Sequence, residues 1–168
     1  YDERMLLHHC PWDPHHIETP DRLRVIWARC QELGLVERCE RLEAREATDQ
    51  ELETYHTRSY LQRFSKGKNK RSEELESECR EYDSVYMSPG TDTAARLATG
   101  SSIDLVTAVL DNKIHCGLGL VRPPGHHAMA DTPCGSIVGV AVHDPPNGLD
   151  CRLTFAVDEY HVLSIASF

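Results

Sequence analysis

The sequence has 168 residues and a formal net charge of −9, a length that suits one domain or part of a larger one. This acidic balance argues against a protein that holds nucleic acid mainly through its phosphates. No apolar run approaches the roughly 20 residues of a membrane-spanning helix, and the start of the chain has no signal-peptide pattern. Because the chain begins at Tyr1 rather than at Met, we expect it to be cut from a longer sequence.

Cysteine and histidine are the two residue types that raise the question of metal binding. The seven cysteines are odd in number and form no Cys-x-x-Cys pair. This pattern predicts reduced thiols in a cytosolic protein rather than disulfides or a structural zinc site. Histidine is unusually frequent, and six of the ten histidines stand in three adjacent pairs: His8-His9, His15-His16 and His126-His127.

The first part of the chain predicts a loop and two helices. Three prolines among the first 20 residues indicate a loop. The apolar spacing after them predicts a helix over residues 21–33. Thr48 and Glu51 form a capping-box pattern, which predicts the start of a second, short helix that ends near residue 55.

The middle of the chain alternates between charged and apolar stretches. The charged run over residues 65–81 predicts a solvated loop and an exposed helix. Residues 83–87 have the pattern of a short strand. Apolar periodicity predicts a long helix over residues 91–110, in which Gly100 indicates close packing against a neighbouring segment. The apolar residues 117–121 then predict a buried strand.

The loop after this predicted strand carries the candidate chemistry. Residues 122–128 read RPPGHHA, in which two prolines and a glycine shape a rigid turn that presents His126 and His127. A helix, an apolar strand and a polar loop in succession are typical of α/β folds, in which ligands bind beyond the carboxyl ends of the strands. Histidine titrates near neutral pH, so one imidazole can act as a base while its neighbour stays charged. A histidine pair alone is more often a surface or packing feature. The surrounding sequence is needed to tell whether this pair is catalytic.

That surrounding sequence resembles a known family. The segment 121–128 (VRPPGHHA) is similar to the signature loop of the zinc-dependent histone deacetylases of class II. Other segments agree with the family in order and spacing over about residues 1–135. They include YDERM at 1–5, YDSVY at 82–86, LATG at 97–100, and HIETPDR at 16–22, where the family usually has His-Pro-Glu-x-Pro-x-Arg. Within the family, the chain resembles class IIb, first the cytoplasmic tubulin deacetylase type with tandem catalytic domains and then the polyamine deacetylase type.

The resemblance implies both a fold and a chemistry. The fold is α/β and arginase/deacetylase-like, with a parallel sheet and flanking helices, incomplete here on the C-terminal side. The implied reaction is deacetylation, in which a zinc ion polarises the acetyl-lysine carbonyl for attack by water. His127 would be the general base and acid, His126 its electrostatic partner, and Arg22 a residue lining an internal cavity. The resemblance also puts four residues at the mouth of the substrate channel: Trp12, Asp13, His15 and His16.

The tail of the chain departs from the family pattern. Where the family continues with Phe-Cys-Phe-Phe-Asn, the residues after Gly135 read SIVGV, so the aromatic wall of the acyl-lysine tunnel is missing. Gly90 stands where the tubulin deacetylase type often has a serine. We therefore expect the N-terminal part of a deacetylase catalytic domain over residues 1–135, followed by a divergent tail over residues 136–168.

The zinc-ligand segment departs most clearly from the family. Residues 152–157 (RLTFAV) read as a strand that ends at an acid, as the family requires. The family then has an Asp-x-His pair that binds zinc, with a further aspartate and a tyrosine later in its sequence, which would lie beyond Phe168. This chain reads Asp158-Glu159-Tyr160-His161 instead. Asp158 and His161 are weak candidate ligands, since both residue types bind zinc.

Two classes of function remain open at this point. The first is a zinc-dependent lysine deacetylase by family, acting on acetylated proteins such as tubulin or histones in the cytoplasm or also in the nucleus. We expect this chain alone to have little or no turnover, because the zinc-ligand segment is missing. The second is a non-catalytic binding or regulatory fragment; a polyamine deacetylase of the same class is a further alternative. We expect no direct binding of nucleic acid or membrane.

Overall fold

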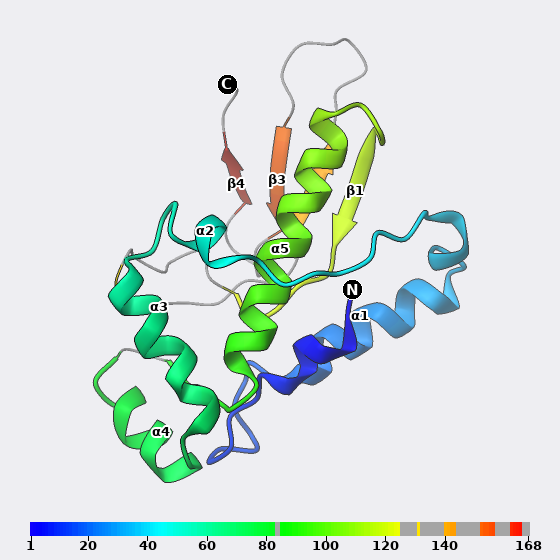
Figure 1. The fold of residues 1–168 in the computed structure, drawn as a ribbon. Helices are drawn as coiled ribbons and strands as arrows, with labels where there is room; N and C mark the ends of the chain where they lie inside the picture. Colours follow the sequence, from blue (N-terminus) through cyan, green and yellow to red (C-terminus); the bar gives the residue numbers. More distant parts are fainter. Residues whose placement is uncertain (83–84, 125–130, 132–139, 144–151, 157–161, 166–168) are drawn as a thin grey trace.

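The computed structural model describes residues 1–82, 85–124, 131, 140–143, 152–156 and 162–165 (Figure 1). Its α-helices are α1 (Pro20–Glu32), α2 (Asp49–Leu52), α3 (Arg58–Ser65), α4 (Ser72–Cys79) and α5 (Thr91–Leu110). Three short 3-10 helices accompany them: η1 (Glu3–Leu7), η2 (Val36–Arg38) and η3 (Lys66–Asn69). The strands are β1 (Cys116–Gly119), β2 (Val140–His143), β3 (Arg152–Ala156) and β4 (Val162–Ile165). No helix among the described residues is both long and apolar enough to cross a membrane.

The four described strands form one sheet in the order β1-β2-β3-β4, and every neighbouring pair is antiparallel. The expectation of a parallel sheet is therefore wrong for these strands. Connection length gives the physical reason for two of the three pairs. Only eight residues separate β2 from β3 and five separate β3 from β4. A parallel pair needs a crossover of a dozen or more residues, whereas short connections join antiparallel neighbours.

Helix α5 organises the core of the described residues. It runs beside the strands along much of the molecule (Figure 1) and packs against η1 and β1. Its apolar face contributes Leu97, Leu105 and Val109 to a buried cluster that also contains Met5 and Leu23. The cluster continues into Leu120 and Val121, which stand directly before the candidate loop. The core therefore joins the N-terminus, α1 and α5 to the residues that lead into that loop.

Close packing at Gly100, expected from the sequence, is confirmed. A Cβ atom at this position would lie 2.4 Å from the carbonyl oxygen of Arg45 and 2.7 Å from the amide nitrogen of Ala47. Residues 45–47 are fixed in this position by contacts with α5. The Ala47 amide donates to the carbonyl oxygen of Arg96 at 2.9 Å, and the Arg45 guanidinium binds the Asp104 carboxylate at 2.8–3.0 Å. Glycine is what allows two backbones to meet here.

Most of the predicted helices are confirmed. The helix expected over 91–110 is α5, and the one expected over 21–33 is α1, shifted by one residue. The Thr48–Glu51 capping box is present in full, although α2 spans only four residues. The strand expected over 117–121 is β1, which begins one residue earlier and ends two residues earlier. The expectation that it is buried is wrong for β1, in which Leu118 is 58% exposed, and holds only for Leu120 and Val121 after it.

Two expectations for the middle of the chain fail. The charged run 65–81 is not wholly solvated, because Leu75 and Cys79 on α4 are buried against Met87. Residues 85–87 are not in a strand, and the first two residues of that expected strand lie outside the described residues. Both failures come from tertiary packing, which local patterns do not report.

The ion-pair network around Arg45 gives the first testable prediction. Hydrogen bonds from Arg45, then from Thr48, lower the pKa of Glu51 from its ordinary 4.5 to about 2. Because this pKa is lower in the folded chain than in the unfolded one, the contribution of Glu51 to stability is complete above about pH 4.5. It is lost as the pH falls towards 2. The stability difference between the natural chain and Glu51→Gln should shrink over that pH range, as measured by urea unfolding.

Glutamine keeps the capping box possible, so this substitution isolates the charge of Glu51. Glu40→Gln is the matched control, since Glu40 is exposed and has no ion pair with a described residue. If the difference between the natural chain and Glu51→Gln stayed constant from pH 6 to about pH 2, the assigned role of Arg45 would be wrong.

Candidate active-site framework

A buried polar cluster lies beneath the start of the candidate loop. It contains Arg122, Glu18, Tyr86 and His8, and is called the Arg122 cluster below. Only 1% of Arg122 is exposed, and it is the largest fully buried side chain among the described residues. Glu18, His8 and Tyr86 are buried as well, at 5–7% exposed. A buried charge is expensive unless it is paired and hydrogen-bonded, so the partners of Arg122 decide whether this arrangement is stable.

The Arg122 guanidinium is surrounded by acceptors from three distant segments. Its Nε donates to Oε1 of Glu18 at 3.2 Å, and its Nη2 donates both to Oε2 of Glu18 and, at 3.0 Å, to the hydroxyl of Tyr86. Its Nη1 donates to the carbonyl oxygens of His8 and Met5. The pair with Glu18 is therefore bidentate, the geometry in which arginine binds a carboxylate most strongly.

Tyr86 and His8 complete the cluster as neutral groups. The Tyr86 hydroxyl donates to Glu18, and burial, then this hydrogen bond, raise the pKa of Tyr86. The imidazole of His8 stacks on the Tyr86 ring with 4.4 Å between centroids, and its Nδ1 lies 2.9 Å from Oγ1 of Thr91. Burial first, and the charge of Arg122 second, hold the pKa of His8 well below its usual range. His8 is therefore uncharged at neutral pH.

This arrangement fixes the residue from which the candidate loop departs. Arg122 is bound to the N-terminal segment, to Glu18 shortly before α1 and to Tyr86 shortly before α5. It immediately precedes the Pro-Pro-Gly-His-His sequence. Glu18 lies only two residues before α1 begins at Pro20. The cluster thus ties the loop of residues 11–19 to the residue from which the candidate loop departs.

The residues expected at the channel mouth divide into two groups. Asp13 and His15 are exposed, and the Asp13 carboxylate caps the turn by accepting from the His15 amide at 2.9 Å. Trp12 and His16 are half-buried and pack inward. Trp12 packs against the buried side chains Leu75, Cys79 and Met87. His16 meets the Tyr86 ring edge-on, with 4.7 Å between centroids. The structure therefore brings His16 together with the Arg122 cluster and leaves Asp13 and His15 facing solvent.

Of the other expected site residues, Arg22 alone lies among the described residues. Arg22 is half-buried in the first turn of α1. His126, His127, Asp158 and His161 lie outside the described residues. At position 90 a side chain would collide with Leu7, since a Cβ would lie 2.4 Å from the Leu7 Cβ, so the serine of the tubulin deacetylase type does not fit this backbone.

Sequence reasoning missed three members of the cluster. Glu18 stood in the quoted motif without a role, and neither His8 nor Tyr86 was singled out as a site residue. A signal was available: Arg122 directly follows the apolar residues 117–121, and a charge in such a place needs a carboxylate partner. Nothing in the local pattern says which of the 27 acidic residues supplies it.

The described residues contain no group of three or more His, Cys, Asp or Glu side chains that could hold a metal ion. The weak candidate ligands Asp158 and His161 lie outside this part of the chain. The five cysteines within the described residues are free thiols. What the described residues supply is a framework: a buried arginine, its carboxylate and the entry to a histidine pair.

Comparisons with known proteins identify the family to which this chain belongs. The fold of the described residues is of the deacetylase class, since it matches the crystal structure of the HDA15 HD domain. That match has a TM-score of 0.71 and 33% identity and covers 86% of this chain and 40% of the other. The histone deacetylase domain family matches residues 16–137. The chain belongs to the histone deacetylase family, and the expected deacetylase fold class is confirmed.

Curated relatives support the same assignment. Histone deacetylase 5 of Arabidopsis thaliana is 38% identical over 139 residues, covering 80% of this chain and 21% of the relative. The polyamine deacetylase HDAC10 of Homo sapiens is 40% identical over 129 residues, covering 76% of this chain and 19% of the relative. Histone deacetylase 6 of Caenorhabditis elegans is 32% identical over 123 residues, covering 73% of this chain and 13% of the relative, so closeness to that subgroup is only loosely supported. The matched part of the chain spans 13–21% of the length of these relatives.

Proposed function

We propose that this chain supplies the histidine-pair part of the catalytic domain of a zinc-dependent lysine deacetylase. The observation that carries the proposal is the family match over residues 16–137, which includes the whole histidine loop and its buried anchor Arg122. The proposed substrates are acetyl-lysine side chains of proteins such as tubulin or histones. The proposed compartment is the cytoplasm or also the nucleus.

The roles of individual residues follow from their positions in the family motif. His127 accepts a proton from the attacking water and later gives it to the leaving amine, and His126 stabilises the charge that His127 acquires. Trp12, Asp13 and His15 contact the substrate at the channel mouth, as does His16 from its place against Tyr86. Arg22 lines a cavity beneath the site.

Zinc, when bound in this family, supplies the electrophile that activates the acetyl carbonyl. The described residues do not form such a site, and the segment 158–161 lacks the Asp-x-His pair. Asp158 and His161 are two donors, whereas a catalytic zinc ion takes three protein ligands. We therefore propose that this polypeptide alone has little or no turnover, and that residues 136–168 are a divergent tail after a family domain over residues 1–135.

Two alternatives rest on specific observations. A polyamine deacetylase is favoured by the 40% identity to human HDAC10, so an acetylated polyamine is the second candidate substrate. A non-catalytic binding fragment is favoured by the altered zinc-ligand segment together with the described channel-mouth loop, whose Trp12 and His16 pack inward.

Acetate release from an acetyl-lysine peptide and from an N-acetylated polyamine, with added zinc, tests the proposal. We expect no release above the buffer rate from either substrate, because one histidine pair cannot replace the missing electrophile. The Ala substitution His127→Ala is the matched control and should behave like the natural chain. Zinc-dependent release that disappears in His127→Ala would contradict the proposed inactivity and establish the role of His127.

A transcript sequence downstream of the Gly135 codon provides a second test of the family assignment. We expect a related transcript in which the frame resumes with the aromatic-Asn segment and an Asp-x-His pair. Absence of such a segment from every transcript of the gene would favour the non-catalytic alternative.

A further inference from the structure

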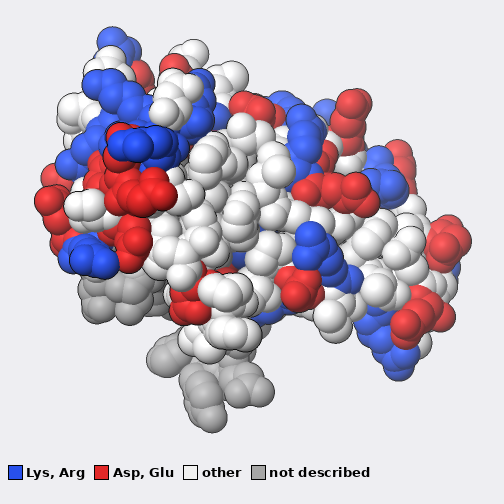
Figure 2. Space-filling model, turned by 90° about the horizontal axis from the view of Figure 1, so that it is seen from below, with Lys and Arg blue, Asp and Glu red and all other residues white. Residues whose placement is uncertain are grey.

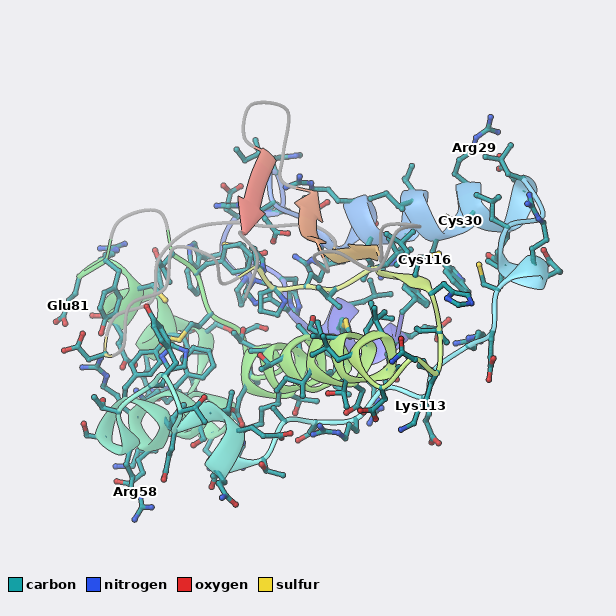
Figure 3. All side chains as sticks on the ribbon, turned by 90° about the horizontal axis from the view of Figure 1, so that it is seen from above. Arg29, Cys30, Arg58, Glu81, Lys113 and Cys116 are labelled. Atoms are coloured by element: carbon teal, nitrogen blue, oxygen red, sulfur yellow. The ribbon has the colours of Figure 1, made fainter. Side chains whose placement is uncertain are left out.

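The most uneven charge distribution in the chain lies over α3, η3 and α4. Residues 58–71 carry six basic groups and no acidic one, in a protein with net charge −9. The following residues, 72–81, carry five glutamates and one arginine. Figure 2 shows blue and red side chains gathered next to each other at the end of the molecule that holds these helices. Figure 3 shows Arg58 and Glu81 at that same end, with Arg58 extending away from the body.

Half of the basic groups are already paired within the chain. Arg58 binds Glu53 at 2.7 Å, Arg71 binds Glu74 at 3.1 Å, and Lys70 binds Glu78. The other three, Arg63, Lys66 and Lys68, are exposed and have no ion pair with a described residue. These three residues are called the basic surface below. Arg63 and Lys66 are three residues apart at the end of α3, so their side chains are neighbours.

Contacts within the chain restrict the motion of part of this surface before any ligand binds. The Arg63 guanidinium lies 5.8 Å from the centroid of the Tyr60 ring and donates to the carbonyl oxygen of Asp131 at 3.0 Å. Neither contact neutralises its charge. Gly67, between the two lysines, is buried against Leu75 of α4, which anchors η3 to the helix that follows. Less side-chain freedom is therefore lost when a ligand binds, which favours affinity.

We propose that the basic surface docks a short acidic peptide segment of a partner protein. Three unpaired cations within six residues match two or three neighbouring carboxylates, and arginine can bind one of them in a bidentate way. The glutamates of α4 border the surface and would repel a long polyanion that extends past it. A nucleic acid, whose phosphates continue along the strand past the three cations, is therefore the less suitable occupant. This docking site does not depend on turnover or on zinc.

Fluorescence anisotropy with a fluorescein-labelled octaglutamate peptide and the full 168-residue chain tests the proposal. The triple substitution of Arg63, Lys66 and Lys68 by glutamine should weaken binding about tenfold, since exposed ion pairs each contribute modestly. The matched control replaces Arg24, Arg29 and Lys113 by glutamine. These residues are also exposed, and Figure 3 shows Arg29 and Lys113 at the opposite end from Arg58.

The control variant changes the net charge by the same amount, so less than about twofold weakening is expected from it. The double variant Lys66→Gln/Lys68→Gln leaves the Arg63–Tyr60 contact intact and should retain the natural circular dichroism spectrum while still losing affinity. The proposal is overturned if the peptide does not bind, if both triple variants weaken binding equally, or if an eight-nucleotide poly(U) RNA binds as tightly as the peptide.

Discussion

Replacing Glu18 by glutamine should lower the free energy of unfolding by about 3–5 kcal/mol, as measured by urea unfolding at pH 7. The substitution keeps the shape of the side chain but leaves the Arg122 guanidinium buried without its counter-charge. Arg122 is 1% exposed, and its Nε and Nη2 both donate to Glu18, so neither water nor another carboxylate among the described residues replaces the lost partner. Such a loss is comparable to the whole stability of a small domain.

Glu32→Gln is the matched control for this prediction. Glu32 also pairs with an arginine, Arg29, at 2.9 Å, but both side chains of that pair are about two-thirds exposed. An exposed pair contributes about 0–1 kcal/mol, so Glu32→Gln should leave the unfolding midpoint almost unchanged. Equal effects of the two substitutions would mean that the Arg122 cluster is not a buried ionic anchor.

Gly100→Ala should destabilise the protein by about 1–3 kcal/mol or more, although the same substitution in an ordinary helix stabilises it by about 1 kcal/mol. The added Cβ would lie within 3 Å of three backbone atoms of residues 45–47. Backbone cannot move aside as the end of a flexible side chain can. The Ala47–Arg96 hydrogen bond and the Arg45–Asp104 pair would both have to shift.

The neighbouring substitution Ser101→Ala provides the control of opposite sign. The Ser101 hydroxyl is buried and has no hydrogen-bond partner among the described residues, so its removal takes away an unsatisfied polar group and improves helix propensity. Ser101→Ala should therefore raise the melting temperature in the thermal scans that show Gly100→Ala lowering it. A stabilising effect of Gly100→Ala would show that α5 does not approach residues 45–47 this closely.

The sequence predicts α1, α2 and α5 because the signals there are local, whereas α3 (Arg58–Ser65) was not predicted. The apolar spacing over 91–110, the capping box at Thr48 and the glycine at position 100 each act within a few residues, and the structure confirms all three. The family was also predictable, because the VRPPGHHA motif and its accompanying segments are specific. The histone deacetylase domain match confirms that assignment.

The rest depends on contacts between distant residues. Arg122 bonds to Glu18 across 104 positions and to the carbonyl of His8 across 114, which no local pattern reports. The parallel sheet was expected from the resemblance to the deacetylase family. The short connections after β2 instead set antiparallel pairing in the described strands. The exposed helix expected within 65–81 buries Leu75 for the same kind of reason.

The central claim is that this chain holds the framework of a deacetylase site without completing its metal centre. Isothermal titration of the full chain with zinc under reducing conditions tests it most directly. We predict that Asp158 and His161 do not bind zinc tightly and stoichiometrically. The double variant Asp158→Asn/His161→Gln should therefore titrate like the natural chain. One equivalent of tightly bound zinc in the natural chain, absent from the double variant, would contradict the claim.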